Sequence, residues 1–190
     1  MVVSNGARVV RRDQQKDYGI CSEQAARILE ALGQYPDLWI TLETGDRDYS
    51  NRPVPEFAST VTDDLPGIAR AEGALKILVH LNCPQTLDIV KSVMTEELYY
   101  TVAHGYLLQI MHKAATKWTG IQAMLALCGS TPEETVYFGD DQDDIAPLKF
   151  CGIGVAVANG IEEAKAAADH ITESNDADGV AKFIEQHILV

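Results

Sequence analysis

The chain has 190 residues, of which 46% are hydrophobic and 23% charged, a composition typical of a globular protein with ample material for a core. Its 15 basic and 28 acidic side chains give a net charge of −13, which argues against nucleic acid and anionic membranes as partners, because both require basic patches. The acidic excess does not exclude a phosphate ester, because a metal ion and one or two lysines reverse the sign of the charge locally.

The cysteines and the apolar runs bear on where the protein works. Cys21, Cys83, Cys128 and Cys151 are far apart and form no Cys-x-x-Cys pair, which favours reduced thiols. No apolar run approaches the ~18 residues of a membrane span. The amino terminus also lacks the order of a signal peptide. The sequence therefore predicts a cytoplasmic protein.

The first part of the chain mixes strand, helix and turn signals. Two short apolar runs flank Asn5-Gly6, a dipeptide that favours a tight turn. Ser22 can cap a helix whose apolar stripe ends at Gly33. The proline-rich segment 50–67 has no clear period, so we interpret it as a loop or short helix lining a surface. The other predicted elements are a helix over 23–33, strands over 38–43 and 74–81, a turn over 45–48, a helix over 84–94, and antiparallel strands over 98–104 and 106–111 joined near Gly105.

From Thr116 onward the pattern changes to alternating helices and strands. The run Val136–Phe138 is short, continuously apolar and bounded by turn signals, which predicts a buried parallel strand. This half of the chain predicts a right-handed βαβ layout with a parallel sheet. Its other predicted elements are a helix over 117–128 that buries Ile121, Met124, Leu125 and Leu127, a brief helix over 144–150, a strand over 154–157, a helix over 161–169, a short strand over 170–172 and a helix over 180–187.

Four carboxylates follow the strand at 136–138 within five residues, namely Asp140, Asp141, Asp143 and Asp144. Open α/β sheets hold their ligands at the carboxyl ends of the strands, which is where this loop falls. Carboxylates so close together repel each other, and a hard cation such as Mg²⁺, which takes oxygen ligands, relieves that repulsion. We therefore interpret the loop as a metal site rather than a solvated acidic turn. A calcium loop is excluded, because Ile145 and Cys151 stand where that loop requires Gly and Glu.

Four motifs in this half occur in a recognisable order: Lys117 at the start of a helix, then Gly139–Asp144, Gly152–Gly160 and Thr172–Val180. They resemble the pattern of the haloacid dehalogenase superfamily, specifically its Cof-type phosphatases. That pattern is a lysine opening a helix, strand-Gly-Asp-x-x-Asn-Asp, Gly-x-x-Val-Ala-x-x-Asn-Ala, and Thr-x-x-Asn-x-x-x-Gly-Val. The segment Ser4–Ala7 is similar to the stretch that leads into the cap domain of that family.

The resemblance implies an α/β fold in two parts. Residues 1–10 and 108–190 would form a partial Rossmann-like core with a parallel sheet. Residues 11–107 would form an inserted α+β cap domain.

The resemblance also implies a chemistry. In such enzymes an aspartate near the start of the chain attacks phosphorus, a second aspartate two residues on acts as general acid and base, and Mg²⁺ and a lysine neutralise charge. It implies that Asp140 binds Mg²⁺ directly and that Asp144 assists, as a metal ligand or from just outside the ligand set. Lys117 would hold the phosphate and the nucleophile, and Asp143 and Asn175 would bind substrate.

Two of these assignments have plainer alternatives. The plainer interpretation of Lys117 is a solvated lysine at a helix start, where the macrodipole mildly disfavours it. Lys113 could serve instead, but its spacing to the Asp140 loop fits the family less well. Asn175 is equally readable as an ordinary turn asparagine.

The chain departs from the family pattern at two points. Asp143 stands where the family usually has an asparagine that contacts phosphate, and a carboxylate there repels a phosphate dianion unless it is protonated or turned towards the metal. The amino-terminal Asp-x-Asp-Gly-Thr segment and the following Ser/Thr motif are absent from the 190 residues, and Asp13 and Asp17 lack the strand and glycine of that segment. We therefore expect the nucleophile to be missing from this polypeptide.

The leading hypothesis is a Mg²⁺-dependent phosphatase of small phosphate esters such as sugar phosphates, in a truncated form that is inactive alone. The alternative is a catalytically inactive binding or regulatory module that keeps the metal loop and the cap. A receiver-like module is a third possibility, weakened equally by the missing phosphoacceptor. Because the missing strands would leave open edges near Val2–Val10 and Val136–Phe138, we also expect a homodimer through the incomplete sheet.

Overall fold

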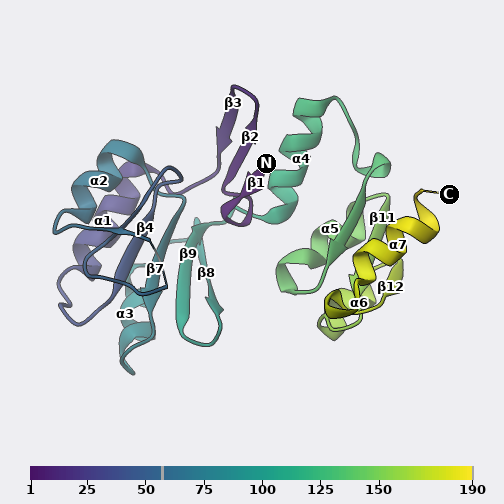
Figure 1. Ribbon diagram of the computed structural model, residues 1–190. Helices are drawn as coiled ribbons and strands as arrows, with labels where there is room; N and C mark the ends of the chain where they lie inside the picture. The colour runs from purple at the N-terminus through teal and green to yellow at the C-terminus, as the bar shows by residue number, and fades with distance from the viewer. Residues whose placement is uncertain (57, 190) are drawn as a thin grey trace. The chain divides into compact units, whose positions relative to one another are not determined.

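The computed structural model describes residues 1–56 and 58–189; Phe57, which falls in the predicted proline-rich loop, and Val190 lie outside the described residues. The chain divides into two compact units (Figure 1). Unit 1 comprises residues 1–6, 10–14 and 116–190, and unit 2 comprises residues 7–9 and 15–115. Among the described residues, no helix combines the length and the apolar character needed to cross a membrane.

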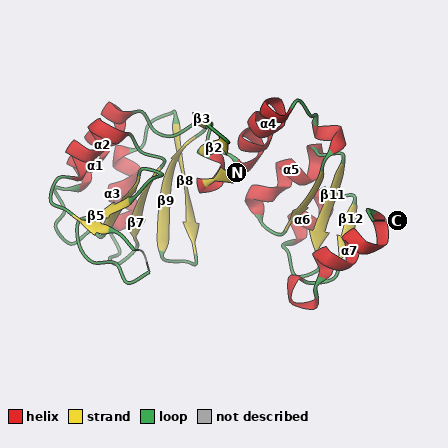
Figure 2. Cartoon of the chain, turned by 45° about the horizontal axis from the view of Figure 1, so that its top comes forward, coloured by secondary structure: helices red, strands yellow, loops and turns green. Residues whose placement is uncertain are grey.

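Unit 2 is built on a six-stranded sheet with the order β6-β5-β4-β7-β9-β8. All neighbouring strands are antiparallel except β5 and β6, which are parallel. Helices α1, α2 and α3 contribute to one apolar core with strands β4, β7 and β9 (Figure 2). The strands are β4 (Ile40–Glu43), β5 (Asp48–Ser50), β6 (Thr60–Val61), β7 (Lys76–His80), β8 (Leu98–Ala103) and β9 (Leu107–His112), and the helices are α1 (Ser22–Leu32), α2 (Leu65–Glu72) and α3 (Thr86–Val93).

The hairpin of β8 and β9 confirms the predicted antiparallel pair. His104 and Gly105 both have positive φ angles, of 53° and 75°, and the Tyr106 N–H donates to the Ala103 carbonyl oxygen. Two consecutive left-handed residues give the turn whose twist matches that of the flanking strands. Strand β9 runs to His112 and pairs with both β7 and β8, so unit 2 extends to Ala115, beyond the predicted domain boundary at residue 107.

Of two predictions about helices in unit 2, one was wrong and the other was confirmed in part, because residues 65–72 form a short helix. Ser22 is the first residue of α1 and not its cap, because Cys21 occupies the N-cap position, without a side-chain cap bond. Helix α2 begins inside the segment that was expected to be a loop or short helix. The Asp64 carboxylate accepts the Gly67 N–H at 2.9 Å and caps that helix. Pro66 lies in the first turn, where its missing N–H has no cost, so it helps to start α2 instead of breaking it.

Three short strands at the amino terminus, β1 (Val2–Val3), β2 (Arg8–Arg11) and β3 (Gln14–Asp17), form a separate sheet. Within unit 2, the buried Arg8 guanidinium donates to both carboxylate oxygens of Asp17, from Nε at 2.9 Å and from Nη2 at 2.8 Å. It also donates to Asp46 at 3.2 Å and to the Thr44 carbonyl oxygen at 3.3 Å. Arg8 thus ties β2 and β3 to the turn between β4 and β5.

Unit 1 contains a three-stranded parallel sheet with the order β10-β11-β12, as predicted for this half. Its strands are β10 (Val136–Gly139), β11 (Ile153–Val157) and β12 (His170–Thr172). Its helices are α4 (Lys117–Cys128), α5 (Ile145–Phe150), α6 (Glu162–Ala167) and α7 (Gly179–His187), with the 3₁₀ turns η1 (Ser4–Gly6), η2 (Pro132–Glu134), η3 (Gln142–Asp144) and η4 (Asn175–Ala177).

Burial in unit 1 is lower than predicted. Val136, Tyr137 and Phe138 are only half-buried, as are the four apolar residues of α4 that were expected in the core. Within the described residues β10 pairs only with β11, so it is an edge strand. A strand with one open edge exposes more of its side chains than a central strand does.

The Arg8 cluster predicts a large stability effect. Arg8→Met removes the guanidinium and leaves Asp17 without its bidentate partner, and hydrogen bonds to charged groups contribute about 1.5–3 kcal/mol each. Because Asp17 remains partly exposed, we expect the free energy of unfolding in urea to fall by about 2 kcal/mol.

Arg70→Met is the matched control for this substitution. Arg70 pairs with Glu23 and Glu30, but its side chain is 43% exposed, and exposed pairs are screened by water and salt. Its loss should be much smaller than that of Arg8→Met. Equal losses in the two variants would contradict the structural role of Arg8.

Candidate functional site

The acidic loop leaves the carboxyl end of β10 and folds back on it. A Cβ atom at Gly139 would lie 2.5 Å from the Cβ of Asp144, so only glycine allows this approach. The turn brings the Asp144 side chain, 2% exposed, beneath the loop. The strand end and the loop therefore form one local structure, which the run of acidic residues alone did not specify.

Asp144 is held by four hydrogen bonds. Its Oδ1 accepts from Lys117 Nζ at 2.6 Å and from the Tyr137 hydroxyl at 2.5 Å. Its Oδ2 accepts from the backbone N–H groups of Asp140 at 3.1 Å and Asp141 at 3.2 Å. A carboxylate has about four acceptor sites, so those of Asp144 are filled. We therefore expect Asp144 to orient the loop and the lysine from outside a metal's ligand set.

The ionisation of the three central groups follows from these contacts. Burial by itself raises the pKa of Asp144, but the hydrogen bond from Lys117, followed by that from Tyr137, outweighs it and leaves the pKa below its usual value. Burial, and then the bond to Asp144, raises the pKa of Tyr137, so its hydroxyl keeps its proton and donates. Desolvation raises the pKa of Asp140, the charge of Asp144 adds to the rise, and Lys117 opposes it.

Lys117 is the first residue of α4. Thr116 precedes it as the N-cap, and its hydroxyl oxygen accepts from the Thr119 N–H at 3.0 Å. The Lys117 side chain is 35% exposed, so it reaches Asp144 without being sealed from solvent. The positive end of the helix dipole lies at the same place, and both features favour an anion there. Lys113, the alternative lysine, is exposed and belongs to unit 2.

Two glycines allow the turn η1 to lie directly on α4. A Cβ atom at Gly6, whose φ is +92°, would come within 1.9 Å of the Thr116 carbonyl oxygen. A Cβ atom at Gly120 would come within 2.4 Å of Val2 Cγ1 and 3.0 Å of Gly6 Cα. This close packing carries Asn5 to the acidic loop, where its Nδ2 donates to Asp143 Oδ2 at 2.8 Å.

The loop after β11 supports Asp140 from the other side. A Cβ atom at Gly160 would lie 2.9 Å from Asp140 Cα, and the Ile161 N–H donates to the Asp140 carbonyl oxygen at 2.8 Å. Asn159 in this loop donates to Asn175 Oδ1 at 2.7 Å and accepts from the Asn175 N–H at 3.2 Å. Asn175 thus braces the loop after β11, and its side-chain oxygen also accepts from the Asp176 N–H at 3.0 Å.

The structure brings several predicted site residues together in unit 1. Lys117 and Asp144 are in contact, and Asp140 joins them through its backbone N–H. Asp143 lies on the neighbouring turn and contacts Asn5. Sequence reasoning missed Tyr137, Asn5 and Asn159. Asn159 stood in a motif that had been recognised, whereas Tyr137 read as an apolar strand residue.

The exposed carboxylate of Asp140 suits a cation that takes few protein ligands. Within residues 1–56 and 58–189, no group of three or more His, Cys, Asp and Glu side chains is arranged to hold a metal. The side chain of Asp140 is exposed, and that of Asp144 is not. Mg²⁺ keeps several waters and takes one or two carboxylates plus substrate phosphates, so a site with Asp140 as its protein ligand fits Mg²⁺.

A hollow of about 280 Å³ lies next to these residues in unit 1. It is lined by the segment 2–6 together with Lys117, Ile121 and Tyr137. The polar ends of Lys117 and Tyr137 both donate to Asp144. The hollow therefore adjoins the contact between Lys117 and Asp144.

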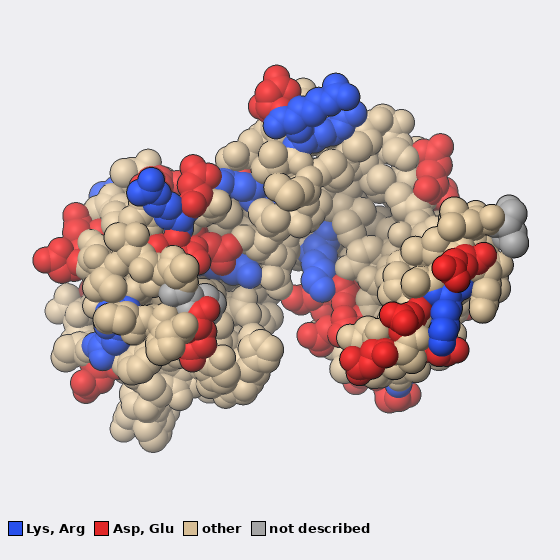
Figure 3. Space-filling view, viewed as in Figure 1, with Lys and Arg blue, Asp and Glu red and all other residues tan. Residues whose placement is uncertain are grey.

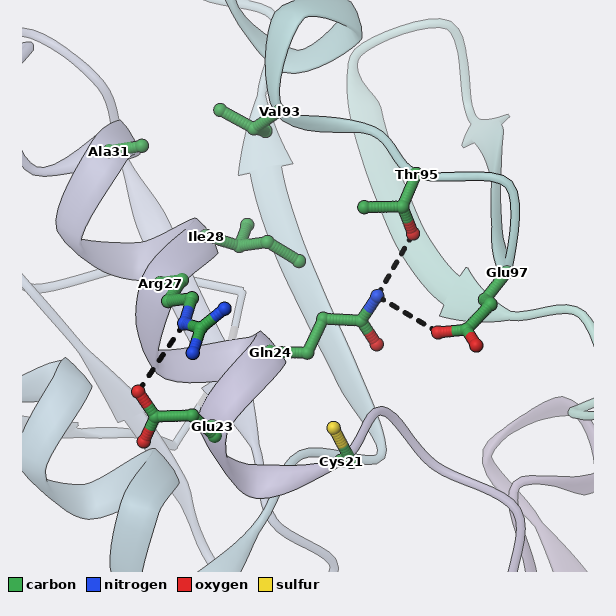
Figure 4. Close-up of a pocket in the computed structure, with 9 residues that line it drawn as sticks. All are labelled: Cys21, Glu23, Gln24, Arg27, Ile28, Ala31, Val93, Thr95 and Glu97. Carbon is green, nitrogen blue, oxygen red and sulfur yellow. Dashed lines mark hydrogen bonds and ion pairs between the residues drawn. The ribbon is translucent and has the colours of Figure 1, made fainter.

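A larger hollow of about 510 Å³ lies in unit 2 beside α1 (Figure 4). Its polar side chains bond to one another: Gln24 Nε2 donates to Thr95 at 2.9 Å and to Glu97 at 3.3 Å, and Arg27 pairs with Glu23. These groups do not converge on an empty point, as those of a ligand site do. Size therefore does not make this hollow the candidate site.

The surface charge does not point to a second site either. Figure 3 shows acidic side chains over both units on the face in view, with basic side chains among them. On this face the acidic side chains are therefore distributed over both units.

The chain is similar to known proteins in both sequence and fold. The family described as haloacid dehalogenase-like hydrolase matches residues 1–184. A 5-amino-6-(5-phospho-D-ribitylamino)uracil phosphatase of Bacillus subtilis is 27% identical over 122 residues, which cover 61% of this chain and 45% of that protein. The chain therefore spans less than half the length of this relative.

Two solved structures share the fold. A haloacid dehalogenase-like hydrolase from Bacteroides thetaiotaomicron gives a TM-score of 0.84 at 22% identity, covering 96% of this chain and 74% of that chain. A sugar phosphatase of haloacid dehalogenase subclass IIB gives a TM-score of 0.75 at 20% identity, covering 100% of this chain and 75% of that chain. Both contain the mixed α/β arrangement of parallel and antiparallel sheets that this chain shows.

The four bonds to Asp144 predict what its amide analogue does. Asp144→Asn replaces one acceptor oxygen by a donor, which faces either Lys117 and Tyr137 or two backbone N–H groups. Because a buried donor then lacks a partner, we expect a loss of about 2 kcal/mol in the free energy of unfolding at pH 7. Asp176→Asn, at an exposed position on η4, is the control and should change little.

The same variant has a defined pH dependence. The folded-state pKa of Asp144 is lowered, so its contribution is fully present above the unfolded value near ~4 and is lost as the pH falls through the folded value. The stability difference between wild type and Asp144→Asn should therefore shrink below about pH 4. A difference that stays constant down to pH 2 would contradict the charged pair.

Proposed function

Because the chain belongs to the haloacid dehalogenase-like hydrolase family, as its motifs predicted, we propose that unit 1 carries the lysine and metal part of a Mg²⁺-dependent phosphatase site. The observation that carries the proposal is the contact of Lys117 with Asp144 beside the exposed Asp140. A cation site and a fixed ammonium group next to each other are what phosphoryl transfer requires, because its transition state spreads negative charge over several oxygens.

Lys117 is the phosphate-binding group in this proposal. Its ammonium has three donors, of which one is directed to Asp144 at 2.6 Å. The other two can serve phosphate oxygens without breaking that bond. The pKa of Asp144 is depressed, chiefly by the hydrogen bonds from Lys117 and Tyr137, so its carboxylate stays charged and holds the orientation of the Lys117 side chain.

Asp140 is the residue that would hold Mg²⁺. When bound, the cation would neutralise charge on a transferring phosphoryl group. The backbone of Asp140 is fixed by Asp144 on one side and by Ile161 on the other. The side chain is thereby presented from a rigid support, as metal ligands generally are.

We propose small phosphate esters, sugar phosphates among them, as substrates. Support comes from the subclass IIB sugar phosphatase that shares the fold and from the phosphatase relative that acts on a phosphoribityl compound by its name. Unit 2, which includes most of residues 11–107, would act as the cap that chooses among substrates. Asn175 would contribute by bracing the loop after β11.

The metal assignment is tested by calorimetric titration of the chain with Mg²⁺. We expect weak binding by the wild type, because Asp140 is its one exposed carboxylate ligand, and no heat of binding for Asp140→Asn. Asp63→Asn makes the same change of charge at an exposed position of unit 2 and should bind as the wild type does. Equal binding by wild type and Asp140→Asn would contradict the assignment.

Turnover is measured with p-nitrophenyl phosphate and sugar phosphates on the same proteins. The 190 residues contain no Asp-x-Asp-Gly-Thr sequence, so we expect negligible hydrolysis by this chain alone, since the covalent route needs that carboxylate. Mg²⁺-dependent hydrolysis that survives repurification and disappears in Lys117→Ala would contradict this expectation. Mg²⁺ binding with no hydrolysis, even when an Asp-x-Asp-Gly-Thr segment is supplied, would favour a binding or regulatory module.

A homodimer through the open edge of β10 is a further proposal. Unpaired backbone groups along an edge strand pair readily with another strand, and the half-buried side chains of β10 and α4 would gain burial. We expect light scattering at low micromolar concentration to give twice the mass of one chain. A stable monomer that melts cooperatively would contradict the proposal.

A further inference from the structure

The contact between Asn5 and Asp143 in unit 1 has no direct role in the proposed phosphatase chemistry. The side-chain amide of Asn5 donates to Asp143 Oδ2 at 2.8 Å, across 138 positions of sequence. We propose that Asn5 is a positioning residue, which holds the Asp143 carboxylate and with it the acidic loop, so that Asp143 supports the cation site and does not contact phosphate. The inference rests on the proposed function, because it assigns a role within that site.

The backbone explains why the residue at position 5 is held so firmly. Ser4, Asn5 and Gly6 all have positive φ angles, of 53°, 56° and 92°. Among residues with a side chain, asparagine is one of the few that adopts this left-handed conformation readily. The close packing of Gly6 on Thr116 and Gly120 then fixes where the Asn5 amide lies.

The charges of the loop explain what the amide does. Asp143 is half-buried, and it directly precedes Asp144, whose own charge is balanced by Lys117. An amide N–H stabilises the charge of Asp143 and limits its rotation, but it adds no positive charge of its own. A carboxylate held in this way still repels a phosphate dianion, so phosphate contact falls to Lys117.

The contact between Asn5 and Asp143 matters because it lies in the same loop as Asp140, the proposed metal ligand. Asp143 and Asp144 belong to the same turn, η3, which ends the loop that begins at Asp140. Asp144 fixes the start of that loop through its backbone N–H groups, and the Asn5–Asp143 bond fixes its far end to η1. Groups that orient a metal ligand in this way typically change metal affinity 10–100-fold when they are removed.

The test uses Asn5→Gly and a pair of exchanged residues in the same chain. Glycine accepts the positive φ and removes only the amide, so we expect Asn5→Gly to weaken Mg²⁺ binding by about tenfold in calorimetric titration. The double variant Asn5→Asp with Asp143→Asn restores the bond with donor and acceptor reversed, at unchanged net charge. It should bind Mg²⁺ within about twofold of the wild type.

Two further measurements separate positioning from structure and from the proposed function. In urea unfolding, the double variant should lose less free energy of unfolding than the two single variants lose together. If the losses simply add, Asn5 and Asp143 do not form a pair. Inorganic phosphate, titrated with Mg²⁺ present, should bind Asp143→Asn only a few-fold more tightly than the wild type, because the substitution removes one nearby negative charge without adding a phosphate contact.

The contrary outcomes are distinct. Wild-type affinity for Mg²⁺ in Asn5→Gly, or an exchanged pair as weak as Asn5→Gly, would overturn the positioning role. Strongly increased phosphate binding by Asp143→Asn would show that Asp143 faces the phosphate. If the wild type binds no Mg²⁺, the proposed function and the metal-supporting role fail together, and the urea cycle still decides whether the two side chains form a pair.

Discussion

The Asp144 carboxylate is the point on which the rest of unit 1 depends. It is almost fully buried, and a buried carboxylate is stable only when its charge and its acceptor sites are satisfied. Here a lysine, a phenol and two backbone N–H groups satisfy them. Those partners come from α4, from β10 and from the acidic loop, so one side chain joins three elements. Removing it would leave Lys117 unpaired and the loop without its anchor.

This arrangement exists because glycine stands at each point of close approach. Gly139 admits Asp144 beneath the loop, and Gly6 and Gly120 let the turn η1 rest on α4. An added Cβ atom would come within 3 Å of the Thr116 backbone at Gly6, of the Asp144 side chain at Gly139 and of the Val2 side chain at Gly120, so a neighbour would have to move. Glycine weakens helices and strands in general, but in unit 1 it is what allows the charged groups to meet. Packing thus sets the electrostatics of the site.

The sequence allowed the acidic loop, its strand and Lys117 to be predicted, because each depends on local pattern or on spacing along the chain. It also predicted the antiparallel hairpin of unit 2, where Gly105 marked the turn. It failed where the outcome depends on contacts between distant residues. Asn5 read only as a turn residue, because nothing near it in sequence reveals a bond to Asp143. Tyr137 was interpreted as an apolar strand residue, because the pattern of a strand does not show which group its hydroxyl contacts.

Two further results concern how proline and apolar residues were interpreted from the sequence. The prolines of segment 50–67 left a loop and a short helix both open, and α2 begins there because proline is favourable in the first turn of a helix. The apolar residues of α4 and β10 suggested a fully buried core, but burial depends on how many neighbours the sheet supplies. Apolar pattern predicts which face of an element turns inward, whereas the extent of burial is a property of the whole assembly.

The charge balance of the site finally implies an order of binding. Lys117 pairs with Asp144, and the Asn5 amide brings no positive charge to Asp143, so the loop holds more carboxylates than the one paired lysine can balance. Charges a few ångströms apart near a protein surface interact by about 4 kcal/mol, so a phosphate dianion entering this loop first would meet net repulsion. A divalent cation reverses the sign, because it is the largest local charge in such a site. In the proposed site, the cation would therefore bind first and the anion second.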